Sequence, residues 1–98
     1  MAETIEGMPR PRKSLFEEQY QEIIRRLIQR RKEIGMTQWD LAAAYGEDQS
    51  FISRIERMQR RLDVYEYTIF CRILQIRPDE ILIPIWEKLP APGSDVEK

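Results

Sequence analysis

Helix-start signals recur along this chain and constrain its fold more than any other feature. A Ser, Thr or Asp followed three residues later by an acidic residue has the spacing of a capping box, which begins a helix. Such a pair stands at the start of three apolar helical patterns: Ser14 with Glu17, Thr37 with Asp40, and Asp63 with Glu66. Apolar residues follow each pair at steps of three and four, the period of an amphipathic helix. No stretch of useful length alternates as a strand does, so we predict an all-α fold.

Stop signals and single caps divide the chain into five predicted helices. They run from Ser14 to Gly35, from Thr37 to Gly46, from Asp48 to about Met58, from Asp63 to Leu74, and from Pro78 until Pro84 ends or kinks the last one. Glycine is the usual left-handed stop of a helix, and proline suits its first turn. Together the helices make one domain of residues 14–89. We expect residues 1–13 to be a disordered basic arm and residues 90–98 to be a flexible tail.

The composition excludes most catalytic and metal sites. The 98 residues include no His and a single Cys, which excludes a Cys/His zinc site, a Cys–His dyad and a Ser–His triad. We therefore expect no enzyme activity, no catalytic residue, no metal and no cofactor. Cys71 falls on the inner face of its predicted helix, where we expect an inert core residue. The chain has neither an apolar run of about 20 residues nor an apolar signal peptide, so we expect a cytoplasmic protein away from the membrane.

The third predicted helix carries a polar stripe. At about 100° per residue, one side of this helix gathers Gln49, Ser50, Ser53, Arg54 and Arg57. Amide, hydroxyl and guanidinium groups are those that read base edges and phosphates, since Gln matches adenine and Arg matches guanine. The formal net charge of −1, from 16 basic and 17 acidic residues, requires any DNA-binding surface to be local. An ordinary solvated face is the alternative interpretation of the stripe.

The second and third predicted helices are short and meet at a sharp turn around Gly46. Their residues form the pattern Thr37-Gln38-x-x-Leu41-Ala42-x-x-x-Gly46-x-x-x-Ser50-x-Ile52-Ser53-Arg54-Ile55-Glu56. This pattern closely resembles the helix-turn-helix of the Cro/phage-repressor-like (Xre-type) DNA-binding proteins, and the resemblance runs without a gap from Leu27 to Leu82. It implies a compact five-helix, lambda-repressor-like domain whose third helix enters the major groove of double-stranded DNA.

The resemblance also implies a role for each polar residue around the third helix. It implies that Gln38 binds a phosphate. The implied base readers are Gln49, Ser50 and Arg54, and the implied phosphate or sugar contacts are Ser53, Arg57, Gln59 and Arg60. Phe51 lies at the border between the core and the polar stripe. Contact with a thymine methyl and packing on the second helix against Trp39 both stay open for this residue.

Two further expectations concern residues outside the polar stripe. Arg31 and Glu56 resemble the partly buried salt bridge that joins the first and third helices in phage repressors, so we expect both to be structural. Met58 and Gln75 stand where many members of the family have Gly. The chain therefore either leaves the third helix by a different turn or extends that helix, and the geometry of the 57–63 loop stays open.

The last predicted helix carries an apolar group made of Ile83, Ile85, Trp86 and Leu89. This group either caps the core or pairs with itself across a two-fold axis, and the small core favours a homodimer. Such a dimer places two reading helices about 34 Å apart and requires a near-palindromic operator. We therefore expect a sequence-specific DNA-binding transcriptional regulator, a repressor, that needs no small-molecule effector.

Other functions fit the same residues and stay open. Three belong to the same class: a prophage repressor, an antitoxin that represses its own operon, and a restriction–modification controller. A protein–protein adaptor built on a helix-turn-helix scaffold belongs to a different class. An adaptor predicts acidic or apolar residues at positions 49, 50, 53 and 54, whereas the chain has Gln, Ser, Ser and Arg there.

Overall fold

Five α-helices and no strand make up the part of the chain that the computed structural model describes, residues 9–91. The helices are α1 (Pro9–Glu33), α2 (Gln38–Tyr45), α3 (Gln49–Glu56), α4 (Val64–Leu74) and α5 (Pro78–Lys88). Their number and order confirm the all-α, five-helix prediction. Among the described residues, no helix combines the length and the apolar character that crossing a membrane requires.

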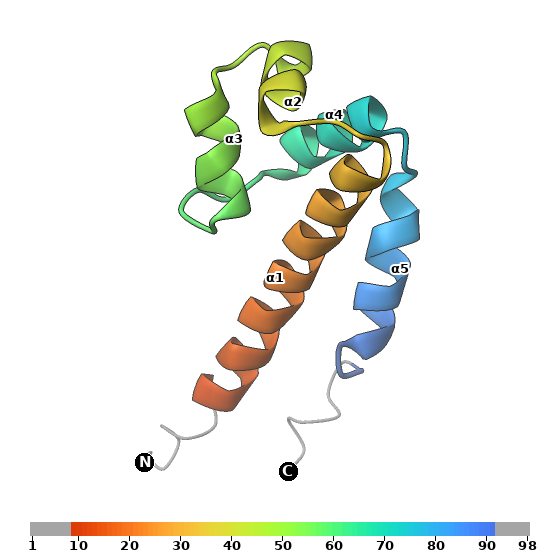
Figure 1. The fold of residues 1–98 in the computed structure, drawn as a ribbon. Helices are drawn as coiled ribbons and strands as arrows, with labels where there is room; N and C mark the ends of the chain where they lie inside the picture. The colour runs from red at the N-terminus through yellow and green to blue at the C-terminus, as the bar shows by residue number, and fades with distance from the viewer. Residues whose placement is uncertain (1–8, 92–98) are drawn as a thin grey trace.

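Helix α1 is the long axis of the arrangement (Figure 1). Helices α2, α3 and α4 gather around its C-terminal half, and α5 runs back alongside it. The first turns of α1 and the last turns of α5 therefore lie at the same end of the molecule. The short helices α2 and α3 lie at the other end, with much of their surface free of the remaining helices.

All five helices contribute to one core. Its most completely buried side chains are Ile24, Leu41, Ile52, Ile55, Phe70, Cys71, Leu74 and Ile81. Tyr67 also joins α4 to α5, because its hydroxyl donates a hydrogen bond to the carbonyl of Pro78 (2.8 Å). The predicted core position of Cys71 is confirmed. Burial raises the pKa of its thiol, which keeps the sulfur protonated and unreactive.

Side-chain caps begin the inner helices where the sequence predicts them. The Thr37 hydroxyl accepts a hydrogen bond from the N–H of Asp40 (3.0 Å), and the Asp40 carboxylate accepts one from the N–H of Thr37 (2.9 Å). The Thr37 N–H also holds the pKa of Asp40 below its ordinary value. Asp63 and Glu66 form the same box at α4, and Asp48 caps α3. The predicted starts of α2, α3 and α4 are therefore confirmed.

Helix α1 begins earlier than the sequence predicts. It starts at Pro9, so Ser14 lies inside the helix and residues 9–13 of the predicted disordered arm are helical. The first N–H groups of any helix have no partner within it, so Pro9 and Pro11 cost the helix no hydrogen bond. Residues 1–8, the rest of the predicted arm, lie outside the described residues.

Helix α5 continues through Pro84 as far as Lys88, so the proline does not end it. Proline removes one backbone N–H and crowds the carbonyl of the preceding turn. Ile81 and Ile85 are 0% and 6% exposed, so apolar packing on both sides of the proline holds the helix together. Of the predicted tail 90–98, the structure describes only the first two residues.

Met58 and Gln75 are the non-glycine residues with positive φ in the described part of the chain (64° and 60°). Helix α3 ends at Glu56 with Arg57 as its C-cap, so the alternative in which it extends to Met58 is wrong. Met58 instead adopts the left-handed conformation that glycine adopts easily. Gln75 does the same at the C-cap of α4. At both positions the backbone has the conformation that favours glycine, although this chain has Met and Gln where the family usually has Gly.

Met58→Gly is expected to stabilise the protein by about 1 kcal/mol. A left-handed residue with a side chain costs roughly 1–2 kcal/mol, and the greater freedom of the unfolded glycine chain offsets part of the gain. Calorimetry should show the midpoint of thermal unfolding rise by about 4–8 °C. Gly46→Ala is the control, because Gly46 has a φ of 95° and its replacement should lower the midpoint. An unchanged or lower midpoint for Met58→Gly would show that the left-handed conformation of Met58 carries no strain.

Candidate nucleic-acid interface

Helices α2 and α3 are joined by a short turn, residues 46–48 (Figure 1). Gly46 takes the left-handed conformation, and its N–H donates a hydrogen bond to the carbonyl of Ala42 (2.8 Å). Ala42 is 3% exposed, and its small side chain lets the backbone of α2 approach its neighbours closely. The structure therefore contains the sharp turn that the sequence predicts.

Helix α3 has one buried side and one exposed side. Its buried residues are Phe51, Ile52 and Ile55. The exposed and half-buried residues of the helix and its C-cap include Gln49, Ser50, Ser53, Arg54 and Arg57. The predicted polar stripe therefore lies at the protein surface, and it brings the proposed base readers together on one short helix.

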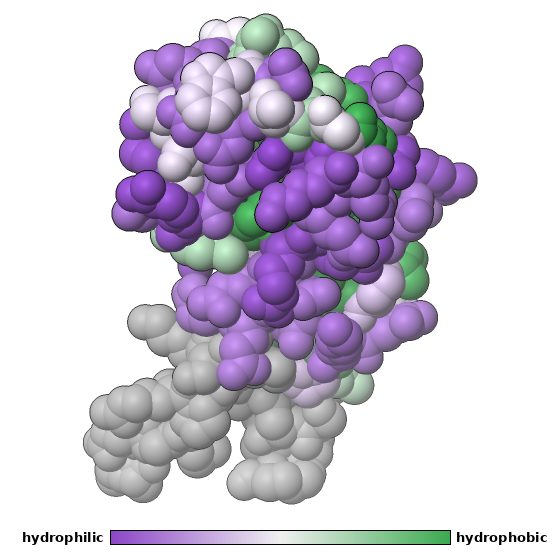
Figure 2. All heavy atoms as spheres, in the orientation of Figure 1, coloured by the Kyte–Doolittle hydropathy of each residue, from purple (hydrophilic) through white to green (hydrophobic). Residues whose placement is uncertain are grey.

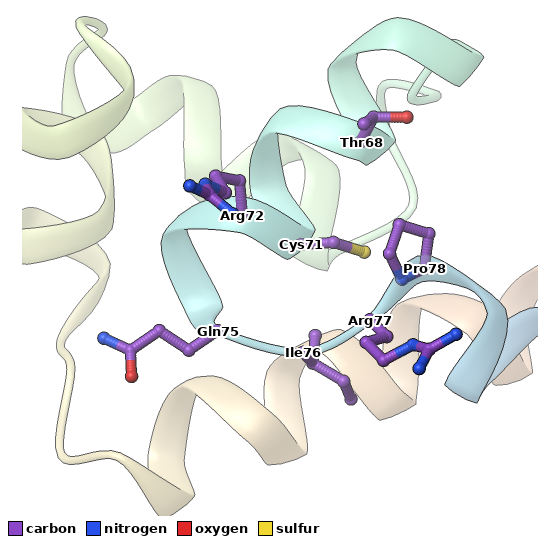
Figure 3. A pocket seen from close by; sticks show the side chains of 7 residues that line it. All are labelled: Thr68, Cys71, Arg72, Gln75, Ile76, Arg77 and Pro78. Carbon is purple, nitrogen blue, oxygen red and sulfur yellow. The ribbon is translucent and has the colours of Figure 1, made fainter.

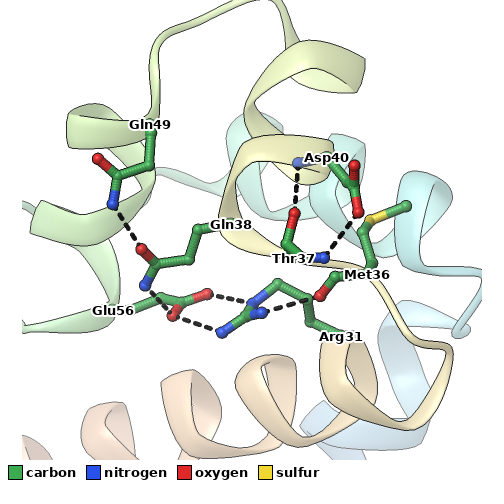
Figure 4. Close-up of polar contacts among 7 residues, drawn as sticks. All are labelled: Arg31, Met36, Thr37, Gln38, Asp40, Gln49 and Glu56. Carbon is green, nitrogen blue, oxygen red and sulfur yellow. Dashed lines mark hydrogen bonds and ion pairs between the residues drawn. The ribbon is translucent and has the colours of Figure 1, made fainter.

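A chain of side-chain hydrogen bonds runs from α1 to the start of α3 (Figure 4). Arg31 binds both carboxylate oxygens of Glu56 (2.7 and 2.9 Å). Glu56 also accepts a hydrogen bond from Nε2 of Gln38 (2.8 Å), and Oε1 of Gln38 accepts one from Nε2 of Gln49 (2.7 Å). Only 8% and 10% of the Arg31 and Glu56 side chains are exposed. The predicted ion pair between the first and third helices is therefore present and buried.

This series of hydrogen bonds fixes the orientation of both glutamine amide groups. The Glu56 carboxylate can only accept, so Gln38 turns its NH₂ group toward Glu56 and its oxygen toward Gln49. Gln49 directs its own NH₂ group at Gln38, and its Oε1 has no hydrogen-bond partner among the described residues. Gln49 therefore offers an oriented acceptor and one further N–H donor. The sequence analysis does not predict the contact between Gln38 and Gln49. The one feature of the sequence that indicates it is that each glutamine is the first residue of its helix.

The polar groups at the start of α3 are also connected. Ser50 Oγ donates a hydrogen bond to Asp48 Oδ1 (2.8 Å), and Arg54 Nη1 reaches Ser50 Oγ at a long 3.4 Å. The Ser50 hydroxyl and a backbone N–H hold the pKa of Asp48 below its ordinary value. Arg54 is exposed and makes only this one weak side-chain hydrogen bond among the described residues. Its guanidinium is therefore available to an incoming ligand.

Phe51 is a core residue in the structure. Its ring stacks on Tyr45 of α2, with the centroids 5.4 Å apart, and the Arg60 guanidinium lies 4.7 Å from its centroid. Packing on the second helix is therefore the observed alternative, with Tyr45 in place of Trp39 as the partner. At 7% exposure, the Phe51 ring offers little surface to a thymine methyl.

Arg60 is occupied within the protein. Its guanidinium binds both carboxylate oxygens of Glu66, each at 2.9 Å. The Arg60 hydrogen bond holds the pKa of Glu66 below its ordinary value. Glu66 is also the acidic partner in the capping box of α4. Arg60, predicted as a phosphate or sugar contact, therefore ties the loop after α3 to α4 in the structure.

Helix α1 holds the other side of the same loop. Arg61 forms an ion pair with Glu17 (2.8 Å), and its guanidinium lies 4.2 Å from the centroid of the Tyr20 ring. Arg57 and Gln59, both predicted phosphate or sugar contacts, stay exposed on this loop. The loop therefore presents them from a backbone that is braced by α4 on one side and by α1 on the other.

An open hollow of about 530 Å³ lies between the end of α4 and the start of α5 (Figure 3). The residues that line it are Thr68, Cys71, Arg72, Gln75, Ile76, Arg77 and Pro78. The thiol belongs to the core, and the side chain of Arg77 pairs with Asp79 (3.0 Å). No two lining residues form a nucleophile–base pair of the kind that catalysis requires. The polar stripe of α3 therefore remains the candidate functional site.

Comparison with known proteins identifies the arrangement. The family model described as Helix-turn-helix matches residues 27–81, more than half of the chain. No curated protein matches the chain. The solved structure of an XRE-family like protein from Pseudomonas syringae pv. tomato str. DC3000 is 37% identical, with a TM-score of 0.74, and the match covers 80% of this chain and 95% of that one. The chain therefore belongs to the Xre-type helix-turn-helix family of DNA-binding transcription regulators.

Proposed function

We propose that the protein is a sequence-specific transcriptional repressor that reads the major groove with α3. The observation that carries this proposal is the hydrogen-bond chain that ends at Gln49, because it orients a base-reading amide in advance. A side chain held in its binding orientation loses less conformational entropy on association than a free one. A protein seated on an operator also excludes other proteins from the same DNA, which is the simplest route to repression.

The exposed side chains of α3 match base edges in the major groove. Adenine presents an N7 acceptor and an N6 donor there, and the Oε1 acceptor and remaining N–H of Gln49 complement both. The exposed guanidinium of Arg54 complements the O6 and N7 acceptors of guanine. Ser50 accepts from a base while its hydroxyl donates to Asp48, or it turns that hydroxyl to donate to a base. These three residues are the base readers of the proposal.

Phosphate contacts come from residues next to the base readers, on α3 itself, at the start of α2 and in the loop after α3. We assign them to Ser53, Arg57 and Gln59, and to Gln38 through the second hydrogen of its NH₂ group, since Glu56 takes the first. Such contacts fix the register of a protein on the duplex and carry no sequence information directly. Arg60 and Phe51 are left out, because Glu66 occupies the Arg60 guanidinium and the Phe51 ring is buried.

We further propose that the protein acts as a homodimer through α5. Ile85 is 6% exposed and belongs to the core, whereas Ile83 and Trp86 are 48% and 71% exposed. Large apolar side chains exposed together on one helix are typical of an interaction surface. A second copy packed against this helix sets the two α3 helices against half-sites about 34 Å apart.

Selection from random-sequence duplexes, followed by a salt titration, tests the proposal. The enriched sequences should share a motif with two half-sites about one helical turn apart. The logarithm of the binding constant should fall linearly with the logarithm of the salt concentration. Tight binders without a common motif contradict base reading, and affinity that ignores salt contradicts the phosphate contacts. A motif with a single unrepeated half-site contradicts the dimer.

A further inference from the structure

Trp39, in the first turn of α2, is 67% exposed. Its ring stacks on no other aromatic ring and lies under no guanidinium in the described part of the chain. Burying an aromatic side chain of this size is strongly favourable. An indole ring exposed to water is therefore a candidate contact for a binding partner. The residue immediately before it is Gln38, which holds Gln49.

The turn of α2 places Trp39 on the exposed side of α2, next to the side that faces α3. Gln38 points toward α3, where it meets Gln49 and Glu56. Leu41 lies about 60° from Gln38 in one direction round the helix, and it packs among apolar residues of α1 and α4. Trp39 lies about 100° from Gln38 in the other direction. Trp39 therefore points into solvent, away from α1 and α4, next to the side of α2 that faces α3.

The residues next to Trp39 indicate which kind of molecule binds there. The exposed side of α3 carries the guanidinium groups of Arg54 and Arg57 next to its amides and hydroxyls. Figure 2 shows a pale area over α2 and α3, at the top of the molecule, bordered by purple hydrophilic side chains. A protein partner at Trp39 has to share this edge with any DNA that α3 binds. When α3 enters the major groove as proposed, the DNA backbone beside that groove lies along this edge.

We propose that Trp39 lays its indole ring against the sugar–phosphate backbone beside the groove that α3 enters. The ring covers a deoxyribose, and the indole N–H donates a hydrogen bond to a phosphate oxygen. The contact helps to position the protein and reads no base. This inference rests on the proposed function, because it requires that α3 binds DNA.

The test compares wild type, Trp39→Ala and Trp39→Phe for binding to the selected operator and to an unrelated duplex. Fluorescence anisotropy of labelled DNA measures the affinities. Trp39→Ala is expected to weaken binding to both duplexes by about tenfold, the equivalent of one buried aromatic contact, and Trp39→Phe by less. The salt dependence should stay the same, because no charge is lost. Saturation with DNA should reduce the acrylamide quenching of tryptophan fluorescence in the wild-type protein and leave it unchanged in Trp39→Phe, whose one tryptophan is Trp86.

Tyr65→Ala is the structural control, because Tyr65 is 74% exposed and is the second residue of α4, as Trp39 is of α2. Neither alanine variant should lower the melting temperature. Trp39→Ala affinity within about twofold of wild type, or unchanged quenching in the complex, overturns the inference in favour of a protein partner and leaves the proposed function standing. A loss of affinity that only follows a lower melting temperature overturns it as well. Absence of DNA binding by the wild-type protein overturns both proposals.

Discussion

Glu56→Ala is expected to lower the free energy of unfolding by about 3–5 kcal/mol, the cost of breaking a buried ion pair. The substitution leaves the Arg31 side chain, 8% exposed, without a negative partner. The remaining hydrogen bond from Arg31 to the carbonyl of Met36 (2.8 Å) does not neutralise its charge. Urea unfolding followed by circular dichroism measures the loss. Because small domains are only marginally stable, the variant should unfold at a much lower urea concentration than wild type.

Two further variants separate a stranded charge from lost packing. Glu56→Gln keeps the size and the acceptor of the side chain, so it should lose less stability than Glu56→Ala. Arg31→Met combined with Glu56→Leu removes both charges. Replacing a buried ion pair by apolar residues is often close to neutral, so the double variant should unfold near the wild-type free energy. A loss below about 1 kcal/mol for Glu56→Ala would give the pair the value of a surface salt bridge and contradict its buried role.

Arg54→Ala is expected to weaken binding to the selected operator by about 10- to 100-fold, since one base contact contributes about 1–3 kcal/mol. Base preference should relax at one base pair of each half-site, because the group that distinguishes guanine is gone. Binding to unrelated DNA should fall far less, since a single charge is lost. Competition between the operator and an unrelated duplex measures the ratio of the two affinities.

Arg72→Ala is the matched control for Arg54→Ala. Arg72 is exposed and carries the same charge, but it lies beside the hollow between α4 and α5 (Figure 3). Its replacement should leave the ratio of specific to non-specific affinity unchanged. If Arg54→Ala lowers both affinities equally, Arg54 contacts phosphate and does not read a base.

The features that depend on neighbours in the sequence could be predicted from it. Thr37 with Asp40, and Asp63 with Glu66, form the capping boxes that their spacing predicts. The same spacing at Ser14 and Glu17 misled, because α1 already begins at Pro9. The polar stripe of α3 follows from the helical period in the same way. The buried partner of Arg31 was predicted through the resemblance, because no local pattern joins it to a residue on α3.

The features that depend on the path of the loops could not be predicted. Arg60 meets Glu66 and Phe51 meets Tyr45 across turns whose directions are set by backbone conformation. The left-handed conformation of Met58 directs the chain after α3. Methionine itself gives no sign of it, and the resemblance, which has Gly at this position, left two alternatives open. The sequence therefore did not indicate Tyr45 as the packing partner of Phe51 or Glu66 as the ion-pair partner of Arg60, and the roles expected for the exposed stripe stay predictions.

Helix α1 touches the loop after α3 toward the middle of its length, and it also packs against α5 (Figure 1). Tyr20 accepts a hydrogen bond from the N–H of Leu62 (3.2 Å), in addition to the contacts of Arg61. In mechanical terms α1 is a strut without a hinge between the proposed dimer surface and the proposed DNA surface. Two such struts fix the rotational phase of the reading helices. An operator lengthened by one base pair turns one half-site by about 34–36°, and a stiff dimer can follow that turn only by twisting or bending the DNA.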